Sequence, residues 1–155
     1  MPVNERSTLG SLVSATCLQQ LRIYTEDLAG RGPILGAGRL RGQGIIVDKG
    51  LVGSKLDDDK LHRLFLEVFG LEGTRLCLVT RVQSNLAGGY EVQLVEGACT
   101  YLAKADAPMC VYTLGVFIGA LQAVSGATMQ GVETECQAMG HATCTYQIRP
   151  HSVLA

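Results

Sequence analysis

Apolar residues recur at helical spacing at the beginning of the chain. Leucines between positions 9 and 28 form one helical face, which predicts a helix that follows a cap at Ser7 or Thr8 and runs to about Leu28. A segment rich in glycine and ending in proline interrupts the pattern, and a second helix is expected from Ile34 to about Ile46. The chain is therefore expected to open with two helices.

Two glycines one helical turn apart, Gly38 and Gly42, lie within the second predicted helix. Their spacing indicates a place where another helix can approach closely. The same segment has a superficial similarity to a dinucleotide-binding loop. However, its spacing is G-x-G-x-x-x-G and no strand precedes it, so a nucleotide site is not expected.

The clearest helical pattern comes next. Asp57 or Asp58 suits its N-terminal cap, and Gly70 follows its expected end. Its apolar positions follow the i, i+3, i+4 spacing of an amphipathic helix. They are Leu61, Leu64, Phe65, Val68 and Phe69.

The pattern then changes to alternation, which is typical of strands. Alternating residues predict strands over 76–81 and 90–95. A fourth helix is expected after Pro108 and reaches about Val124. It is apolar almost all round, which predicts a central buried helix. Two closing strands are expected over 128–135 and 143–148, joined by a loop.

The order of these elements favours one fold class. Three helices, two strands, a helix and two strands indicate an α+β fold, with an antiparallel four-stranded sheet and helices packed on one side. The chain has 155 residues and no internal repeat or low-complexity linker. We therefore expect residues 1–155 to form a single domain.

Composition narrows the classes of function. Apolar residues make up 47% of the chain, charged residues 17%, and the formal net charge is −1. Arg39 and Arg41 form only a small basic spot, so direct binding of nucleic acid is not expected. No apolar run is long enough to span a membrane, and the polar N-terminus carries no signal core. The expectation is a soluble, cytoplasmic protein, and the high apolar content favours a homodimer.

Candidate chemistry is concentrated near the C-terminus. Cys110, Glu133, Cys136 and Cys144 are a plausible complete ligand set for one tetrahedral zinc ion. Because Cys110 comes from a separate element, the ion would hold two parts of the fold together. Spacing alone leaves a competing interpretation open, in which the thiols are ordinary buried cysteines.

Other residues compete for a place in this set. By spacing alone, Glu135 is as good a carboxylate as Glu133, and His141 lies within the same loop. The remaining thiols have no partners at ligand spacing and are interpreted as core residues. They are Cys17, Cys77 and Cys99.

The segment from Pro108 to Ile148 resembles the C-terminal half of the 4-vinyl reductase domain family. The shared pattern is a cysteine at the head of an apolar helix, then E-T-E-C-x-A-x-G, then a cysteine that opens a strand. That family includes ligand-sensing domains of phenol-responsive bacterial transcription activators and proteins linked to bacteriochlorophyll synthesis. It is structurally akin to small subunits of the TRAPP vesicle-tethering complex.

The resemblance implies a structural zinc ion on Cys110, Glu133, Cys136 and Cys144, with Glu133 preferred over Glu135. It also implies a hydrophobic pocket backed by residues of the fourth helix. The candidates are Tyr112, Leu114, Phe117, Ile118 and Leu121, although they could equally fill the core outright. His62 is a further candidate because the phenol sensors use a histidine on the ligand, and a surface histidine is the other interpretation. Those sensors also use a tryptophan, which this chain lacks.

We therefore expect a domain that binds a small hydrophobic or aromatic ligand, as a sensor or carrier, and not a catalyst. The four ligands would close the metal site, and no nicotinamide or flavin motif is present. One alternative is a protein of tetrapyrrole biosynthesis. The other is a TRAPP-like scaffold for protein interaction. Fold-level analogy does not choose among them.

Overall fold

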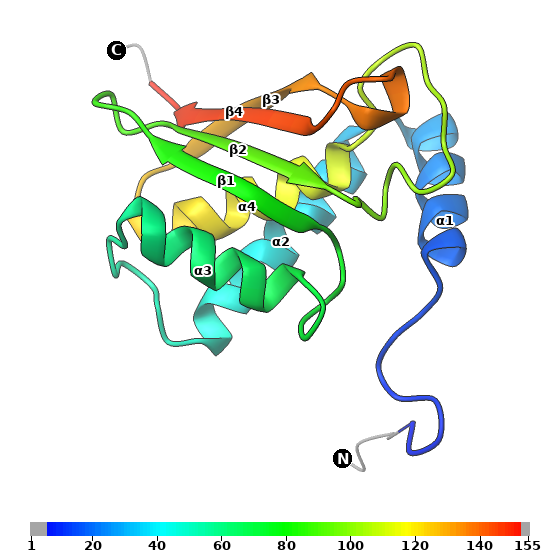
Figure 1. Cartoon of the computed structure of the whole chain (residues 1–155), viewed down its shortest axis with the longest axis horizontal. Helices are drawn as coiled ribbons and strands as arrows, with labels where there is room; N and C mark the ends of the chain where they lie inside the picture. The colour runs from blue at the N-terminus through cyan, green and yellow to red at the C-terminus, as the bar shows by residue number, and fades with distance from the viewer. Residues whose placement is uncertain (1–5, 153–155) are drawn as a thin grey trace.

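The computed structural model describes residues 6–152 and confirms the predicted fold class and element order (Figure 1). Four helices and four strands follow one another in the expected sequence. They are α1 (Ala15–Ala29), α2 (Gly32–Asp48), α3 (Asp58–Phe69), β1 (Leu78–Ser84), β2 (Tyr90–Val95), α4 (Val111–Ser125), β3 (Met129–Glu135) and β4 (Cys144–Pro150). A short 3-10 helix, Gln137–Met139, lies between β3 and β4.

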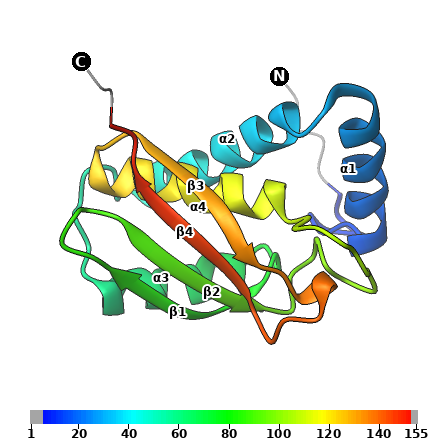
Figure 2. The ribbon, with the colours of Figure 1, turned by 90° about the horizontal axis from the view of Figure 1, so that it is seen from above.

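The strands form one antiparallel sheet in the order β1-β2-β4-β3. Helices α3 and α4 lie against one face, and α2 packs behind α4 (Figures 1 and 2). The opposite face is polar, with Gln147 donating a hydrogen bond of 2.6 Å to Glu91 across β4 and β2. Because one face is covered and the other meets water, the strands alternate between apolar and polar residues.

Helix α4 is the centre of the core. Most of its residues are buried, as its uniform apolar pattern predicts. Phe117 from α4 packs against Phe65 and Phe69 of α3 at ring-centroid distances of 5.3 and 5.2 Å. Its ring also lies 5.9 Å from that of Tyr146 on β4. This aromatic cluster joins α3, α4 and the sheet.

Glycines let α2 and α4 touch through their backbones, as the Gly38 and Gly42 spacing indicates. A Cβ added at Gly38 would lie 2.3 Å from the backbone oxygen of Tyr112, and one at Gly42 would lie 1.9 Å from that of Val116. The packing is reciprocal, since Gly119 of α4 faces the backbone of α2. No side chain larger than hydrogen fits at these positions.

Helix α1 starts later than expected. The prediction placed its cap at Ser7 or Thr8, whereas the cap is Ser14, whose hydroxyl accepts a hydrogen bond of 3.3 Å from the Cys17 backbone N–H. Gly10 has φ +67°, a left-handed conformation that interrupts a helix between positions 7 and 14. The earlier leucines therefore belong to an irregular segment.

The burial expected for α1 is also wrong. Cys17, interpreted as a core residue, is exposed, whereas Cys77 and Cys99 are buried. Leu21 and Leu28 are 66% and 72% exposed. The apolar face of α1 is therefore largely uncovered in the single chain.

The other boundaries agree more closely. The third helix and the strand over 90–95 match their predictions, while β1 begins two residues later than expected, at Leu78. Within residues 6–152, no helix combines the length and apolarity that a membrane crossing needs.

Asp57 caps α3 with its side chain, which accepts a hydrogen bond of 2.9 Å from the Lys60 backbone N–H. This bond holds the pKa of Asp57 below its ordinary value of 3.8. The cap therefore adds stability that is complete above that value and is lost as the pH falls through the lower pKa of the folded state.

We expect Asp57→Ala to lower the free energy of unfolding at neutral pH, because the N–H groups of the first turn lose their acceptor. The difference from the parent protein should shrink as the medium becomes more acidic than pH 3.8. Urea denaturation across this range checks the result. Asp59→Ala, which removes an exposed acid of the same turn, is the matched control. Equal effects of the two substitutions at neutral pH would contradict the capping role.

Candidate metal centre and ligand cavity

Cys110, Glu133, Cys136 and Cys144 meet in the interior. One ligand atom from each lies within 4.8 Å of the others, and all four residues are buried. The Cys110 Sγ lies 4.0 Å from the Cys136 Sγ and 3.9 Å from the Cys144 Sγ. A cluster of three thiols and a carboxylate at these separations could hold a metal ion.

Three different elements place these side chains. Cys110 is the residue that precedes the first turn of α4, Glu133 lies near the end of β3, and Cys144 opens β4. Cys136 follows β3 directly and precedes the 3-10 helix. The cluster thus joins the start of the central helix to the edge pair of the sheet.

A β-bulge explains how Glu133 and Cys136 share one face. Residues three apart on a regular strand point to opposite faces. Here Glu133 pairs with Tyr146 and Glu135 pairs with Thr145, so β3 carries one residue more than β4 across this interval. The extra residue reverses the alternation, which returns Cys136 to the buried side occupied by Glu133.

The hydrogen bonds leave one carboxylate oxygen free. The Cys110 backbone N–H donates to Glu133 Oε2 at 3.0 Å. Oε1 of the same carboxylate is buried and has no partner among residues 6–152. A buried carboxylate oxygen without a partner is costly, and a cation would satisfy it. The donor set therefore fits a metal ion.

The thiols differ in acidity because they are hydrogen-bonded to one another. Cys110 acts as the donor to Cys144, which together with burial raises the pKa of Cys110 and lowers that of Cys144. The Gln137 backbone N–H also donates to Cys144 Sγ at 3.3 Å, which favours its thiolate. Burial raises the pKa of Cys136. Cys144 is therefore the thiol that loses its proton most readily.

The competing candidates lie outside the cluster. Glu135 is exposed and accepts a hydrogen bond of 2.9 Å from the Thr145 hydroxyl. The His141 Nδ1 accepts a hydrogen bond of 3.1 Å from the Cys136 backbone N–H, so the imidazole supports the loop from outside. The structure thus places Glu133, and neither of these residues, beside the thiols.

Sequence reasoning missed Tyr146 as a neighbour of the cluster. Its hydroxyl is fully buried without a partner among residues 6–152, and burial raises its pKa, with Cys110 and Glu133 acting in the same direction. The available signal was its position two residues after Cys144, because alternate residues of a strand share a face.

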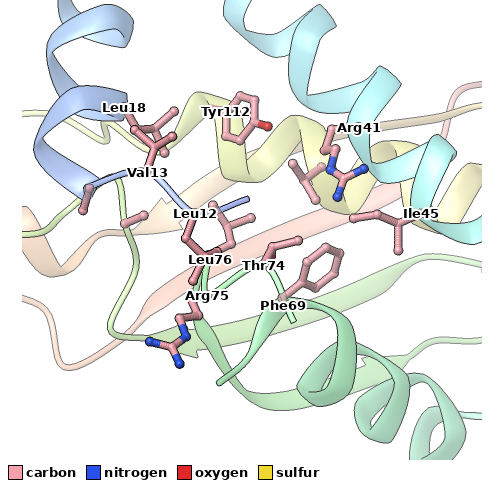
Figure 3. Close-up of a pocket in the computed structure, with 13 residues that line it drawn as sticks. Leu12, Val13, Leu18, Arg41, Ile45, Phe69, Thr74, Arg75, Leu76 and Tyr112 are labelled. Carbon is pink, nitrogen blue, oxygen red and sulfur yellow. The ribbon is translucent and has the colours of Figure 1, made fainter. Parts of the chain in front are cut away.

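A cavity of about 460 Å³ lies on the other side of the first turns of α4 (Figure 3). Four separate segments line it: the stretch leading into α1, the middle of α2, the loop between α3 and β1, and the start of α4. Its apolar walls include Leu12, Phe69, Leu76 and Val116. A shallower hollow of about 760 Å³ shares Leu12 with it and opens outward.

Three polar side chains face this cavity. The hydroxyl of Tyr112 points toward Arg41 across the space between α4 and α2 (Figure 3). Thr74 lines the opposite wall, and its Oγ1 is buried without a hydrogen-bond partner among residues 6–152. The cavity therefore combines apolar walls with a few convergent polar groups, as small-molecule sites do.

The structure separates the residues predicted to bind ligand. Tyr112 lines the cavity. Leu114, Phe117, Ile118 and Leu121 lie on other faces of α4 and are packed in the core. His62 is half-buried, and its Nε2 lies 2.9 Å from the Val79 backbone oxygen. The other cavity residues escaped sequence reasoning because they come from segments far apart in the chain.

Several solved structures share the fold of this chain. The phenol-responsive sensory domain of the transcription activator PoxR, solved with phenol, has a TM-score of 0.70 and 23% identity, covering 90% of this chain and 76% of that one. A vinyl-4-reductase family protein from Methanocaldococcus jannaschii has a TM-score of 0.62 and 13% identity, covering 93% and 85%. At these identities the likeness establishes the fold.

A third similar structure is a trafficking protein particle complex subunit 3 from Naegleria fowleri, covalently bound to palmitic acid. It has a TM-score of 0.57 and 14% identity, covering 89% of this chain and 90% of that one. No curated protein matches the chain by sequence.

The family model of the 4-vinyl reductase domain matches residues 96–150. This range contains α4, β3 and β4 and all four residues of the buried cluster. The chain therefore matches the 4-vinyl reductase domain family over residues 96–150, and the resemblance that its sequence motifs indicate is confirmed.

Proposed function

We propose that this domain binds a small hydrophobic or aromatic molecule in the cavity beside α4, as a sensor or carrier, and that a structural zinc ion stabilises the domain. The observation that carries the proposal is the adjacency of the two sites. Cys110 of the buried cluster and Tyr112 of the cavity are separated by one residue at the start of the same helix. The fold shared with the PoxR phenol-sensing domain supports it.

Zinc is the ion that the donor chemistry favours. Thiolates are soft ligands that select zinc over magnesium or calcium. Cys110, Glu133, Cys136 and Cys144 would supply four ligands, which closes the coordination sphere, and closed sites are structural. When bound, the ion would add a cross-link between α4 and the sheet. No catalytic role is proposed for it.

A homodimer in the cytoplasm is part of the proposal. Leu21, Tyr24 and Leu28 on α1 are exposed, and a second copy of the chain would cover such an apolar face. A reducing compartment would keep the clustered cysteines available as metal ligands.

Ligand binding is tested with 2-naphthamide, a neutral aromatic probe, by calorimetric titration of the purified zinc-loaded protein. We expect saturable binding at one site per chain. Ala98→Phe, which places a ring at a half-buried position in the cavity wall, should abolish binding or weaken it at least about tenfold by occupying the space. Ala87→Phe, at an exposed position between β1 and β2, is the matched control and should bind as the parent does.

A native mass spectrum of the same preparation should show one zinc ion per chain. Absence of probe binding at millimolar concentration, in a protein that is folded and loaded with zinc, would contradict the ligand-binding function. Equal binding to the parent and to Ala98→Phe would place the ligand elsewhere.

A further inference from the structure

The enclosed cavity has a positive end. Among residues 6–152, Arg41 and Arg75 are the charged residues that line it, and no acidic residue does so. Arg75 points away from the space between α2 and α4, whereas the Arg41 guanidinium points into it (Figure 3). The acidic residues of this region, Asp48, Glu67 and Glu72, line the outer hollow instead. The two parts of the opening therefore differ in charge.

Arg41 is available for a ligand. It takes part in no ion pair within residues 6–152, although Lys49 on the same helix pairs with Glu67. Its charge reaches the Tyr112 hydroxyl, because it opposes the rise that burial causes in the pKa of Tyr112. A guanidinium and a hydroxyl that converge in this way offer several donors to one acceptor group.

Neutral ligands would leave this arrangement partly unused. A phenol or an alcohol could bond to Tyr112 or Thr74, but it would gain no ion pair from Arg41. A carboxylate accepts from a guanidinium with two oxygens and accepts from a hydroxyl as well, and such charge-assisted bonds are the stronger kind. The apolar walls then exclude highly polar acids, which would lose water without compensation.

We propose that the cavity selects an apolar organic acid in its anionic form, an aryl or alkyl carboxylate, with the carboxylate on Arg41 and Tyr112. The inference rests on the proposed ligand-binding function and specifies its substrate class. The apolar body of the acid lies against Leu12, Phe69 and Val116. The volume of about 460 Å³ is in the range of ordinary small-molecule sites.

The test compares 2-naphthoate with 2-naphthamide at neutral pH. These probes have the same ring system and differ mainly in charge. We expect the parent protein to bind 2-naphthoate roughly tenfold to a hundredfold more tightly than 2-naphthamide, the range that hydrogen bonds to a charged group provide. Titration calorimetry of the zinc-loaded protein gives both dissociation constants.

Two variants assign the effect to residues. Arg41→Gln removes the charge at an exposed position and should reduce the preference for 2-naphthoate to less than about threefold, while leaving the affinity for 2-naphthamide unchanged. Tyr112→Phe keeps the ring and should weaken 2-naphthoate binding by a smaller factor. Arg63→Gln, which removes an exposed arginine on α3 outside the cavity lining, is the control and should retain the full preference.

The outcomes separate this inference from the function on which it rests. If 2-naphthamide binds as tightly as 2-naphthoate, or if Arg41→Gln retains the preference, the selection of acids is wrong while ligand binding stands. If neither probe binds to the folded zinc-loaded protein, both proposals fail. Thermal melts of each variant establish that it is folded.

Discussion

Cys136→Ser is expected to lose the metal ion and most of the stability of the domain. Cys136 is fully buried and comes from the segment that joins β3 to β4, so its replacement opens the proposed coordination sphere on that side. Structural zinc supplies on the order of 10 kcal/mol of apparent folding free energy, which is comparable to the whole stability of a domain of this size. Zinc content by mass spectrometry and urea denaturation measure the two effects.

The matched control is Cys77→Ser, which alters another buried thiol outside the cluster. That variant loses packing but should retain one zinc ion per chain. A chelator should then destabilise the parent protein and Cys77→Ser, and should have little further effect on Cys136→Ser. A Cys136→Ser protein that is free of metal and as stable as the parent would contradict a structural role for the ion.

Gly42→Ala is expected to destabilise the protein severely, although the change adds a single methyl group. Its Cβ would lie 1.9 Å from the Val116 backbone oxygen, and backbone cannot move aside as the end of a side chain can. Separation of α2 from α4 should cost on the order of 3 kcal/mol, near the upper end for overpacked cores. Urea denaturation of the zinc-loaded protein gives the value.

Gly44→Ala provides a control on the same helix. A Cβ at Gly44 meets no atom within 4 Å, so the substitution should gain up to about 1 kcal/mol from helix propensity alone. The two changes are chemically identical and should have opposite signs. Equal effects at both positions would show that helix propensity, and not the contact with α4, sets the stability.

The strongly periodic elements were predictable from the sequence. Residues 58–69 have one apolar face and a capping aspartate, and residues 90–95 alternate cleanly, so local pattern and tertiary burial agree. Helix α1 was misplaced at its start because Ser7, Thr8 and Ser14 are all suitable caps by type. The choice depends on the left-handed backbone of Gly10, which no periodicity reveals.

The candidate site was predictable only where it is local or where the family resemblance supplies it. Spacing could not choose between Glu133 and Glu135. The choice rests on the bulge in β3, which is a property of strand pairing and leaves no periodic signal in the sequence. Arg41, Thr74 and Tyr112 converge from three elements, and their proximity follows from how α2 and α4 pack.

The glycine contact between α2 and α4 also has a consequence for molecular recognition. Gly38 meets the backbone of Tyr112, and Arg41 lies one helical turn after Gly38. Backbone touching backbone leaves no side chains that could rearrange between the two helices, so the segments that carry Arg41 and Tyr112 are preorganised. The conformational entropy of positioning those segments is lost on folding and not again on binding. Adaptation to ligands of different shape then falls to the remaining walls, the segment leading into α1 and the loop between α3 and β1.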